Sequence, residues 1–245
     1  MRNLKMILEY DGSRYKGWQK QPDNNLTLQG KIESALSKME GERSEVAGCE
    51  RTDVGVHAEN YMANFHTNCD LSIDAIMDYL NENFPDDIAV KSIVEASEKF
   101  NVEYNIKSIT YVYKISDSQL RDVFNRKYVY NAEMKLNLEN MRTTAEYLVG
   151  THDFQYLSTV SPNTKNTTRT INYLNIVEKD NMIEIEINAD GFLWNMVRII
   201  MGSLIEVGKG KIDAMDVEKL LTETTASAYI PMAKAKGLAL RGVEY

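Results

Sequence analysis

Alternation of apolar and polar positions predicts several strands along the chain. Residues 4–10 place apolar side chains at every second position, an imperfect strand pattern that ends at the turn signal Asp11-Gly12. The same period is clearest at 183–187, where isoleucine alternates with glutamate. Further extended segments are predicted at 61–67, 88–96, 106–115 and 238–240.

Apolar side chains three and four residues apart predict helices between these strands. The first helix begins after Thr27, which we expect to cap it, and the second begins at Ser72 and ends before Pro85. The two later helices are predicted at 138–149 and 193–207, the second of them apolar on most sides and therefore buried. Residues 157–172 are polar and rich in turn formers, which predicts a long loop.

This order of elements favours an α+β fold. Each half of the chain has strands interleaved with two helices, and strands also follow one another directly, which is typical of a mixed or largely antiparallel sheet. A length of 245 residues allows one large domain or two small ones. We expect an N-terminal half at 1–103 and a C-terminal half at 104–245.

The charge balance argues against nucleic-acid binding without excluding it. Lys and Arg total 28 against 36 Asp and Glu, a net charge of −8, whereas phosphate neutralisation needs cations. Charge is uneven, however: residues 1–20 hold five basic and two acidic side chains, and residues 74–103 hold two basic and eight acidic ones. A local basic cleft is therefore compatible with the composition.

Metal, disulfide and membrane classes find no support in the sequence. Cys49 and Cys69 are the only cysteines and form no CxxC pair, and the three histidines are widely spread. No apolar stretch reaches the length of a membrane span, and the N-terminus has no apolar signal region. We expect a cytoplasmic protein with no membrane contact, no metal and no cofactor.

One segment carries candidate chemistry. Residues 48–58, GCERTDVGVHA, place Arg51, Thr52 and Asp53 together, and Gly55 permits a tight backbone path. A neighbouring cation favours the ionised form of a carboxyl, and an ionised Asp53 can act as nucleophile or electrostatic stabiliser. By composition alone the segment is more typical of an ordinary turn than of a catalytic site, and His57 is more typical of a packed or hydrogen-bonded histidine than of a catalyst.

Several motifs in the same order resemble one family. ERTDVGVHA at 50–58 is similar to the GRTDxGVHA segment of the tRNA pseudouridine synthase A family. The other matching segments are YDGSRYKGWQKQP, LNENFPDDIAV, TYVYKI, GTHDFQ, RTI, FLWNMVRIIMGSLIEVGKG and KGLALRGVEY. The resemblance implies two related α/β halves sharing a central mixed, mostly antiparallel sheet, a homodimer, and isomerisation of uridine to pseudouridine at tRNA positions 38 to 40.

The resemblance also implies roles for three catalytic residues. Asp53 matches the catalytic aspartate, which either attacks C1′ of the ribose or removes the C2′ proton. Tyr111 matches the active-site tyrosine, and Arg198 the basic residue that pairs with the aspartate. From the residues alone, Tyr111 is a strand residue of the core and Arg198 a structural ion-pair partner at a helix.

Substrate contacts are expected from a further set of residues. Arg51 matches an arginine that inserts into RNA and holds the flipped nucleotide out, a step needed because C1′ and C5 are inaccessible in a stacked helix. Leu238 matches an apolar wall of the uracil pocket, and Trp18 either stacks on a base or pins its loop. The predicted RNA-binding cations are Arg14, Lys16, Lys20, Arg121, Arg126, Lys127, Lys165, Arg169, Lys234 and Lys236.

Departures from the family pattern leave rival functions open. Glu50 stands where the family has Gly, and Glu103 where it has Arg, so negative charge is added at two positions. A paralogue that modifies another RNA site is one rival, and an RNA-binding protein without catalysis is another. A glycosidase has little support, because no second carboxylate accompanies Asp53.

Overall fold

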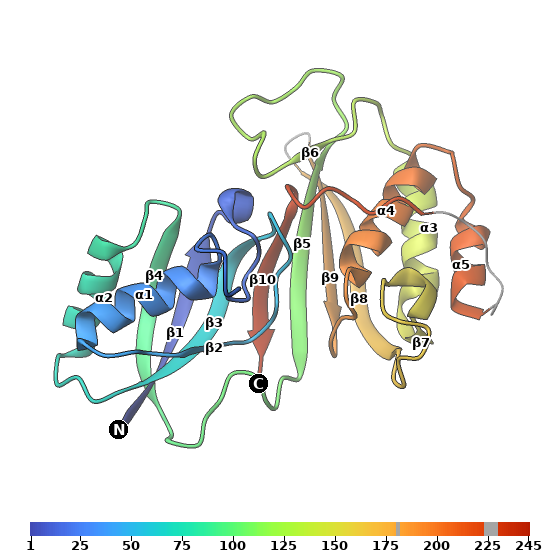
Figure 1. Cartoon of the computed structure of the whole chain (residues 1–245). Coiled ribbons are helices and arrows are strands. Elements are labelled where there is room, and N and C mark those ends of the chain that lie inside the picture. The colour runs from blue at the N-terminus through green and yellow to red at the C-terminus, as the bar shows by residue number, and fades with distance from the viewer. Residues whose placement is uncertain (180–181, 223–229) are drawn as a thin grey trace. The chain divides into compact units, whose positions relative to one another are not determined.

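The chain forms two compact units, each with a sheet and helices (Figure 1). The computed structural model describes residues 1–179, 182–222 and 230–245. Unit 1 comprises Met1–Lys107 with Ala239–Tyr245, and unit 2 comprises Ser108–Leu238. The strands of both units are mixed but mostly antiparallel, so the predicted α+β class is confirmed.

The sheet of unit 1 is built around two long antiparallel strands. The strand β1 (Arg2–Tyr10) pairs with β3 (His57–Thr67) on one side and β4 (Ile88–Ala96) on the other, both antiparallel. The short strand β2 (Val46–Gly48) pairs antiparallel with β3, and the C-terminal strand β10 (Leu238–Glu244) pairs parallel with it. Their inward side chains, with Leu4, Met6 and Leu8 fully buried, form the core.

Two helices, α1 (Leu28–Glu40) and α2 (Ile73–Asn83), pack on this sheet, and a short 3-10 helix, η1 (Gly12–Arg14), follows β1. Their apolar stripes bury Ile32 and Leu36 from α1 and Ile76 and Leu80 from α2. Ser72 caps α2 as predicted, since its side chain accepts a hydrogen bond from the amide of Ala75.

The helix α1 begins after Thr27, as predicted, but the expected side-chain cap is wrong. The hydroxyl of Thr27 is buried and makes no capping bond, and among the residues that the structure describes it has no hydrogen-bond partner. Two backbone carbonyls replace it: the amide of Leu28 donates to Gly17 (3.2 Å) and that of Gln29 to Trp18 (3.0 Å). Two of the four unpaired donors at the N-terminus of the helix are thus satisfied by Gly17 and Trp18.

Unit 2 has an antiparallel sheet in the order β5-β9-β8-β7. Its strands are β5 (Ser108–Ser116), β9 (Met182–Ala189), β8 (Thr168–Lys179) and β7 (Gly150–Asp153), and β6 (Tyr130–Asn131) pairs parallel with β5. The long loop predicted at 157–172 is wrong beyond residue 167, where β8 begins.

Three helices lie on one face of this sheet: α3 (Leu138–Leu148), α4 (Met196–Gly208) and α5 (Ala214–Thr222), with a 3-10 turn η2 (Gln155–Leu157). Every residue of α4 except Arg198 and Glu206 is buried, as its apolar sequence predicted. Within the described ranges, no helix has the length and apolar character to cross a membrane.

Candidate active site

The segment that carries Asp53 connects β2 to β3 and follows their pairing. The amide of Cys49 donates to Met62 (3.0 Å), which continues the ladder up to the start of the loop. Arg51 is exposed, Thr52 is 5% exposed, and Asp53 is partly exposed, so alternate side chains face outward and inward. Residues 53–56 then form a turn, in which the amide of Val56 donates a hydrogen bond to the carbonyl of Asp53 (3.1 Å). Gly55 within this turn has a positive φ of +80°.

Thr52 anchors this loop to the core. Its hydroxyl shares a buried 2.8 Å hydrogen bond with the phenol of Tyr10, the last residue of β1. Its carbonyl accepts from the amide of Trp18 at 3.0 Å. Burial raises the pKa of Tyr10 well above its ordinary value, so the phenol stays neutral and hydrogen-bonding. Thr52 therefore fixes the backbone on which Asp53 stands.

Trp18 and Tyr61 support the loop from the other side. The indole is 2% exposed and stacks on Tyr61, with ring centroids 4.1 Å apart and an interplanar angle of 27°. The phenol of Tyr61 donates in turn to the carbonyl of Glu50. The buried indole of Trp18 therefore packs the loop against β3, while its predicted contact with a base stays a prediction.

Two glycines let the 12–17 segment approach the loop closely. A Cβ on Gly12 would lie 1.9 Å from the carbonyl oxygen of Val56, and one on Gly17 would lie 2.8 Å from that of Thr52. The amide of Gly12 donates to Nδ1 of His57 (3.1 Å), which requires this nitrogen to be unprotonated. Oδ1 of Asp11 also lies 3.3 Å from Nδ1, so the buried ring of His57 is held against the start of the 12–17 segment.

Cys49 is not a competing nucleophile. It is buried beneath the loop, and burial raises the pKa of its thiol to about 12. At neutral pH the group is therefore a thiol rather than the reactive thiolate.

Unit 2 contributes the other two predicted catalytic residues. Tyr111 lies on β5 and is 6% exposed, with its ring edge-on to Phe192 at 5.5 Å between centroids. Arg198 lies in the first turn of α4, where its Nε donates to the carbonyl of Ala233 (3.0 Å). The carbonyl of Arg198 accepts from the amide of Ala233 (2.9 Å), so helix and side chain are held by one residue.

The segment 231–237 ties α4 to β5. A Cβ on Gly202 would lie 1.9 Å from the carbonyl oxygen of Pro231, so only glycine lets this segment cross the helix. The phenol of Tyr113 donates to the carbonyl of Lys234 (2.9 Å), and the amide of Lys114 donates to Gly237 (2.9 Å). Leu238 follows at once and is buried. Sequence analysis singled out Lys234 and Lys236 in this segment but not its contacts with α4 and β5, because backbone carbonyls leave no signal in the side chains.

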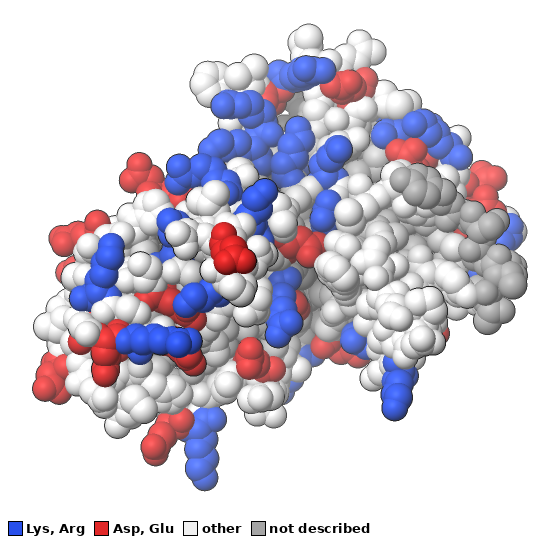
Figure 2. All heavy atoms as spheres, viewed as in Figure 1, with Lys and Arg blue, Asp and Glu red and all other residues white. Residues whose placement is uncertain are grey.

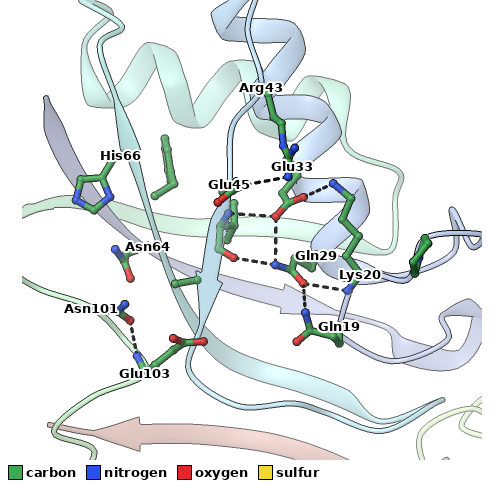
Figure 3. Close-up of a pocket in the computed structure, with 14 residues that line it drawn as sticks. Gln19, Lys20, Gln29, Glu33, Arg43, Glu45, Asn64, His66, Asn101 and Glu103 are labelled. Carbon is green, nitrogen blue, oxygen red and sulfur yellow. Dashed lines mark hydrogen bonds and ion pairs between the residues drawn. The ribbon is translucent and has the colours of Figure 1, made fainter.

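Several predicted RNA-binding cations are already paired. Arg14 binds Asp87 at 2.6 Å, and Arg121 binds Glu133 at 3.1 Å. Lys20 binds the buried carboxylate of Glu33 at 2.6 Å, which also contacts Gln29 in a polar pocket beside β2 (Figure 3). The side chain of Lys16 is exposed.

Glu50 and Glu103, the two acidic residues that depart from the family pattern, lie in different parts of unit 1. The carboxylate of Glu50 accepts a hydrogen bond from the amide of Arg51 (2.9 Å), so it turns back onto the loop. Glu103 is exposed and lines the same polar pocket as Lys20 and Glu33. Figure 2 shows Lys and Arg side chains interspersed with Asp and Glu over α1, so local arrangement rather than net charge decides where an anion binds.

No resident metal is supported by the side chains that the structure describes. Across residues 1–179, 182–222 and 230–245, no three His, Cys, Asp or Glu side chains gather into a group suited to a metal ion.

Comparison with known proteins identifies the class to which this site belongs. Residues 6–105 and 144–245 match the sequence profile of a family described as tRNA pseudouridine synthase. A solved structure titled "Crystal Structure of a Cbf5-Nop10-Gar1 Complex" aligns over 97% of this chain and 48% of that chain, with 8% identity and a TM-score of 0.37. The match to the family profile sets the class, which is that of the pseudouridine synthases, a group of isomerases.

Full-length relatives narrow this class. The tRNA pseudouridine synthase A 1 of Clostridium tetani is 54% identical over 245 residues, and the tRNA pseudouridine synthase A 2 of Bacillus cereus is 41% identical, both over 100% of each chain. The tRNA pseudouridine synthase A of Acetivibrio thermocellus is 40% identical over the same span. This chain therefore belongs to the tRNA pseudouridine synthase A family.

Proposed function

We propose that this protein converts uridine to pseudouridine at positions 38 to 40 of the tRNA anticodon stem-loop, with Asp53 as its catalytic carboxylate. The reaction breaks the N1–C1′ bond of uridine and joins C5 to C1′ of the same ribose, so C5 loses a proton and N1 gains one. The observation that carries the proposal is the partly exposed position of Asp53 on a loop whose neighbours Glu50 and Thr52 are hydrogen-bonded to the core residues Tyr61 and Tyr10.

Rigid placement of one carboxylate suits this chemistry. Asp53 attacks C1′ or removes the C2′ proton, and both roles require an ionised carboxylate held in one geometry. Arg51 faces outward beside it, the position expected of a guanidinium that replaces a flipped base in the stack. The anchoring of Thr52 and Glu50 keeps both outward side chains in a fixed frame.

Tyr111 and Arg198 complete the proposed catalytic set. The ring of Tyr111 stacks on the uracil, and its hydroxyl assists removal of the C5 proton. The permanently charged guanidinium of Arg198 keeps the carboxylate of Asp53 ionised. The bond from Nε of Arg198 to Ala233 supports this role, because it fixes the plane of the guanidinium. Leu238 forms an apolar wall of the uracil pocket.

We also propose that the enzyme acts as a homodimer and that it is located in the cytoplasm. Light scattering tests the oligomeric state, and cell fractionation tests the location.

The target uridine is tested with labelled tRNA. Purified protein is incubated with tRNA carrying [5-³H]uridine, and release of tritium is followed by mapping of pseudouridine in the product. Transcripts that retain uridine only at 38, 39 or 40 are expected to be modified, whereas a transcript with none of the three is expected to be inert.

A second candidate target is a different uridine of tRNA. It is favoured by Glu50 and Glu103, because carboxylates in place of glycine and arginine repel phosphates at those positions. Tritium release from the transcript that lacks uridine at 38 to 40 would select this candidate and contradict the first.

A further inference from the structure

A groove in unit 1 carries two lysines, Lys31 and Lys38, that sequence analysis did not single out. Helix α1 forms one side, and the residues after β1 and the turn between α2 and β4 form the other. It encloses about 620 Å³ and is lined by three basic side chains, Arg14, Lys31 and Lys38. None of the described residues that line it carries a carboxylate.

Lys31 and Lys38 are available to a ligand. They lie seven residues apart on α1 and so share one face of the helix. Within the part of the chain that the structure describes, neither ammonium has a hydrogen-bond or ion-pair partner. By contrast, Lys20 and Arg14 are bound to Glu33 and Asp87. Lys31 and Lys38 thus keep their positive charge unpaired by any described carboxylate, although the protein as a whole has a net charge of −8.

The apolar walls of the groove strengthen the electric field of these two lysines. Tyr15, Phe84 and Pro85 line it with aromatic and apolar surface, and Tyr15 and Phe84 are largely buried. The phenol of Tyr15 donates to Asp87, so its polar end is already occupied. A cleft with low-dielectric walls and charges of one sign concentrates the field, which favours an anion.

The spacing favours an extended polyanion over a single anion. Seven residues of α-helix rise about 10.5 Å, more than one phosphate group spans. The groove is also connected to the Asp53 loop: the 12–17 segment supplies Arg14 to the groove and packs Gly12 and Gly17 against Val56 and Thr52. One nucleic-acid strand that passes the loop therefore has a basic track beside it.

We propose that this groove binds the sugar-phosphate backbone of the tRNA substrate, with Lys31 and Lys38 as phosphate contacts. The proposal rests on the proposed function for the identity of the RNA. It adds a binding surface outside the loop that carries Asp53, and it explains how an acidic protein holds a polyanion.

The test compares two double variants with the same change of charge. Lys31→Ala/Lys38→Ala removes the groove cations, and Lys99→Ala/Lys107→Ala removes two exposed cations of unit 1 outside the groove. Binding of full-length tRNA is measured by fluorescence anisotropy at several salt concentrations, and circular dichroism checks that both variants fold.

The groove variant is expected to raise the Kd for tRNA about tenfold or more. The slope of log K against log salt is expected to fall by about 1.5, since two phosphate contacts are lost. Lys31→Arg/Lys38→Arg is expected to keep both values. Equal weakening by the groove and control variants would overturn the proposal, as would competition by polyglutamate as effective as that by tRNA.

The binding measurement is independent of catalysis. It is made in the Asp53→Asn background, in which no turnover occurs during the titration. Failure of the proposed function appears as no tritium release by the unsubstituted protein, whereas failure of the groove proposal appears as an unchanged Kd.

Discussion

The phenol of Tyr10 and the hydroxyl of Thr52 share a buried hydrogen bond of 2.8 Å across 42 residues of sequence. The bond joins the end of β1 to the loop that carries Asp53, so the loop is fixed by the core of unit 1 rather than by its own turn alone. Because both groups lie inside the fold, each depends on the other for a partner.

Thr52→Val tests this anchor while keeping the shape of the side chain. The variant leaves the Tyr10 phenol buried without a partner, and we expect the free energy of unfolding in urea to fall by about 1–3 kcal/mol. The pseudouridine synthase kcat is expected to fall with it, because the Asp53 backbone loses its support. Tyr10→Phe added to Thr52→Val is expected to recover part of the stability; strictly additive losses would contradict a direct bond.

Gly17→Ala tests the close approach of the 16–18 segment to the loop. Gly17 and Gly41 both have positive φ, +89° and +74°, so alanine strains both by about 1–2 kcal/mol. Only at Gly17 would the new Cβ also meet a backbone atom, the carbonyl oxygen of Thr52 at 2.8 Å. We expect a larger loss of stability and a loss of activity at Gly17 alone. Equal effects of Gly17→Ala and the matched Gly41→Ala would show that the contact is unimportant.

The two cysteines are expected to react at different rates. Burial raises the pKa of Cys49 to about 12, whereas Cys69 is partly exposed. Iodoacetamide at pH 8 is expected to modify Cys69 first, with Cys49 labelled only on unfolding. Peptide mass spectrometry over time measures this, and early labelling of Cys49 in the folded protein would refute its burial.

Glu206 is expected to make stability depend on pH. Burial opposes ionisation of Glu206, but hydrogen bonds and charges of Lys209 and Lys211 outweigh it and lower the pKa of the carboxyl. A lowered folded-state pKa gives stability that is complete above the ordinary value of about 4.5 and is lost as pH falls through the folded value.

Glu206→Gln therefore has a predicted pH signature. We expect it to lower the free energy of unfolding by about 1–2 kcal/mol at pH 7, and the difference to be smaller at pH 3, because more of the carboxyl is protonated there. Urea titrations at both pH values measure it, with exposed Glu218→Gln as the control. An equal deficit at pH 3 would show that packing, not charge, is lost.

Much of the fold was predictable from the periodicity of apolar residues along the chain. The helices at 28–40, 73–83 and 138–148 and the strands at 88–96 and 182–189 lie close to where periodicity placed them. The strand β8 was missed for a physical reason. A β-bulge between Ile171 and Tyr173 shifts the register, so the buried Ile171 and Leu174 are three residues apart and the period of two is broken.

The support of the site was harder to predict than its chemistry. Arg51, Thr52 and Asp53 stand out in the sequence, and Trp18 is predicted either to stack on a base or to pin its loop. The other two anchors, Tyr10 and Tyr61, are marked by alternation only as core. A buried tyrosine needs a partner for its hydroxyl, and this is the one signal that pointed beyond packing at Tyr10. Backbone contacts such as Ala233 on Arg198 leave no trace in composition.

The role of Asp53 is tested most directly by release of tritium from [5-³H]uridine-labelled tRNA under single-turnover conditions. Asp53→Asn is compared with Asp23→Asn, the same change at an exposed position of unit 1. We predict no release above background for Asp53→Asn, with the Kd for tRNA within about tenfold of the unsubstituted protein, and full release for Asp23→Asn. Release by Asp53→Asn at a rate close to that of the unsubstituted protein would contradict the catalytic assignment.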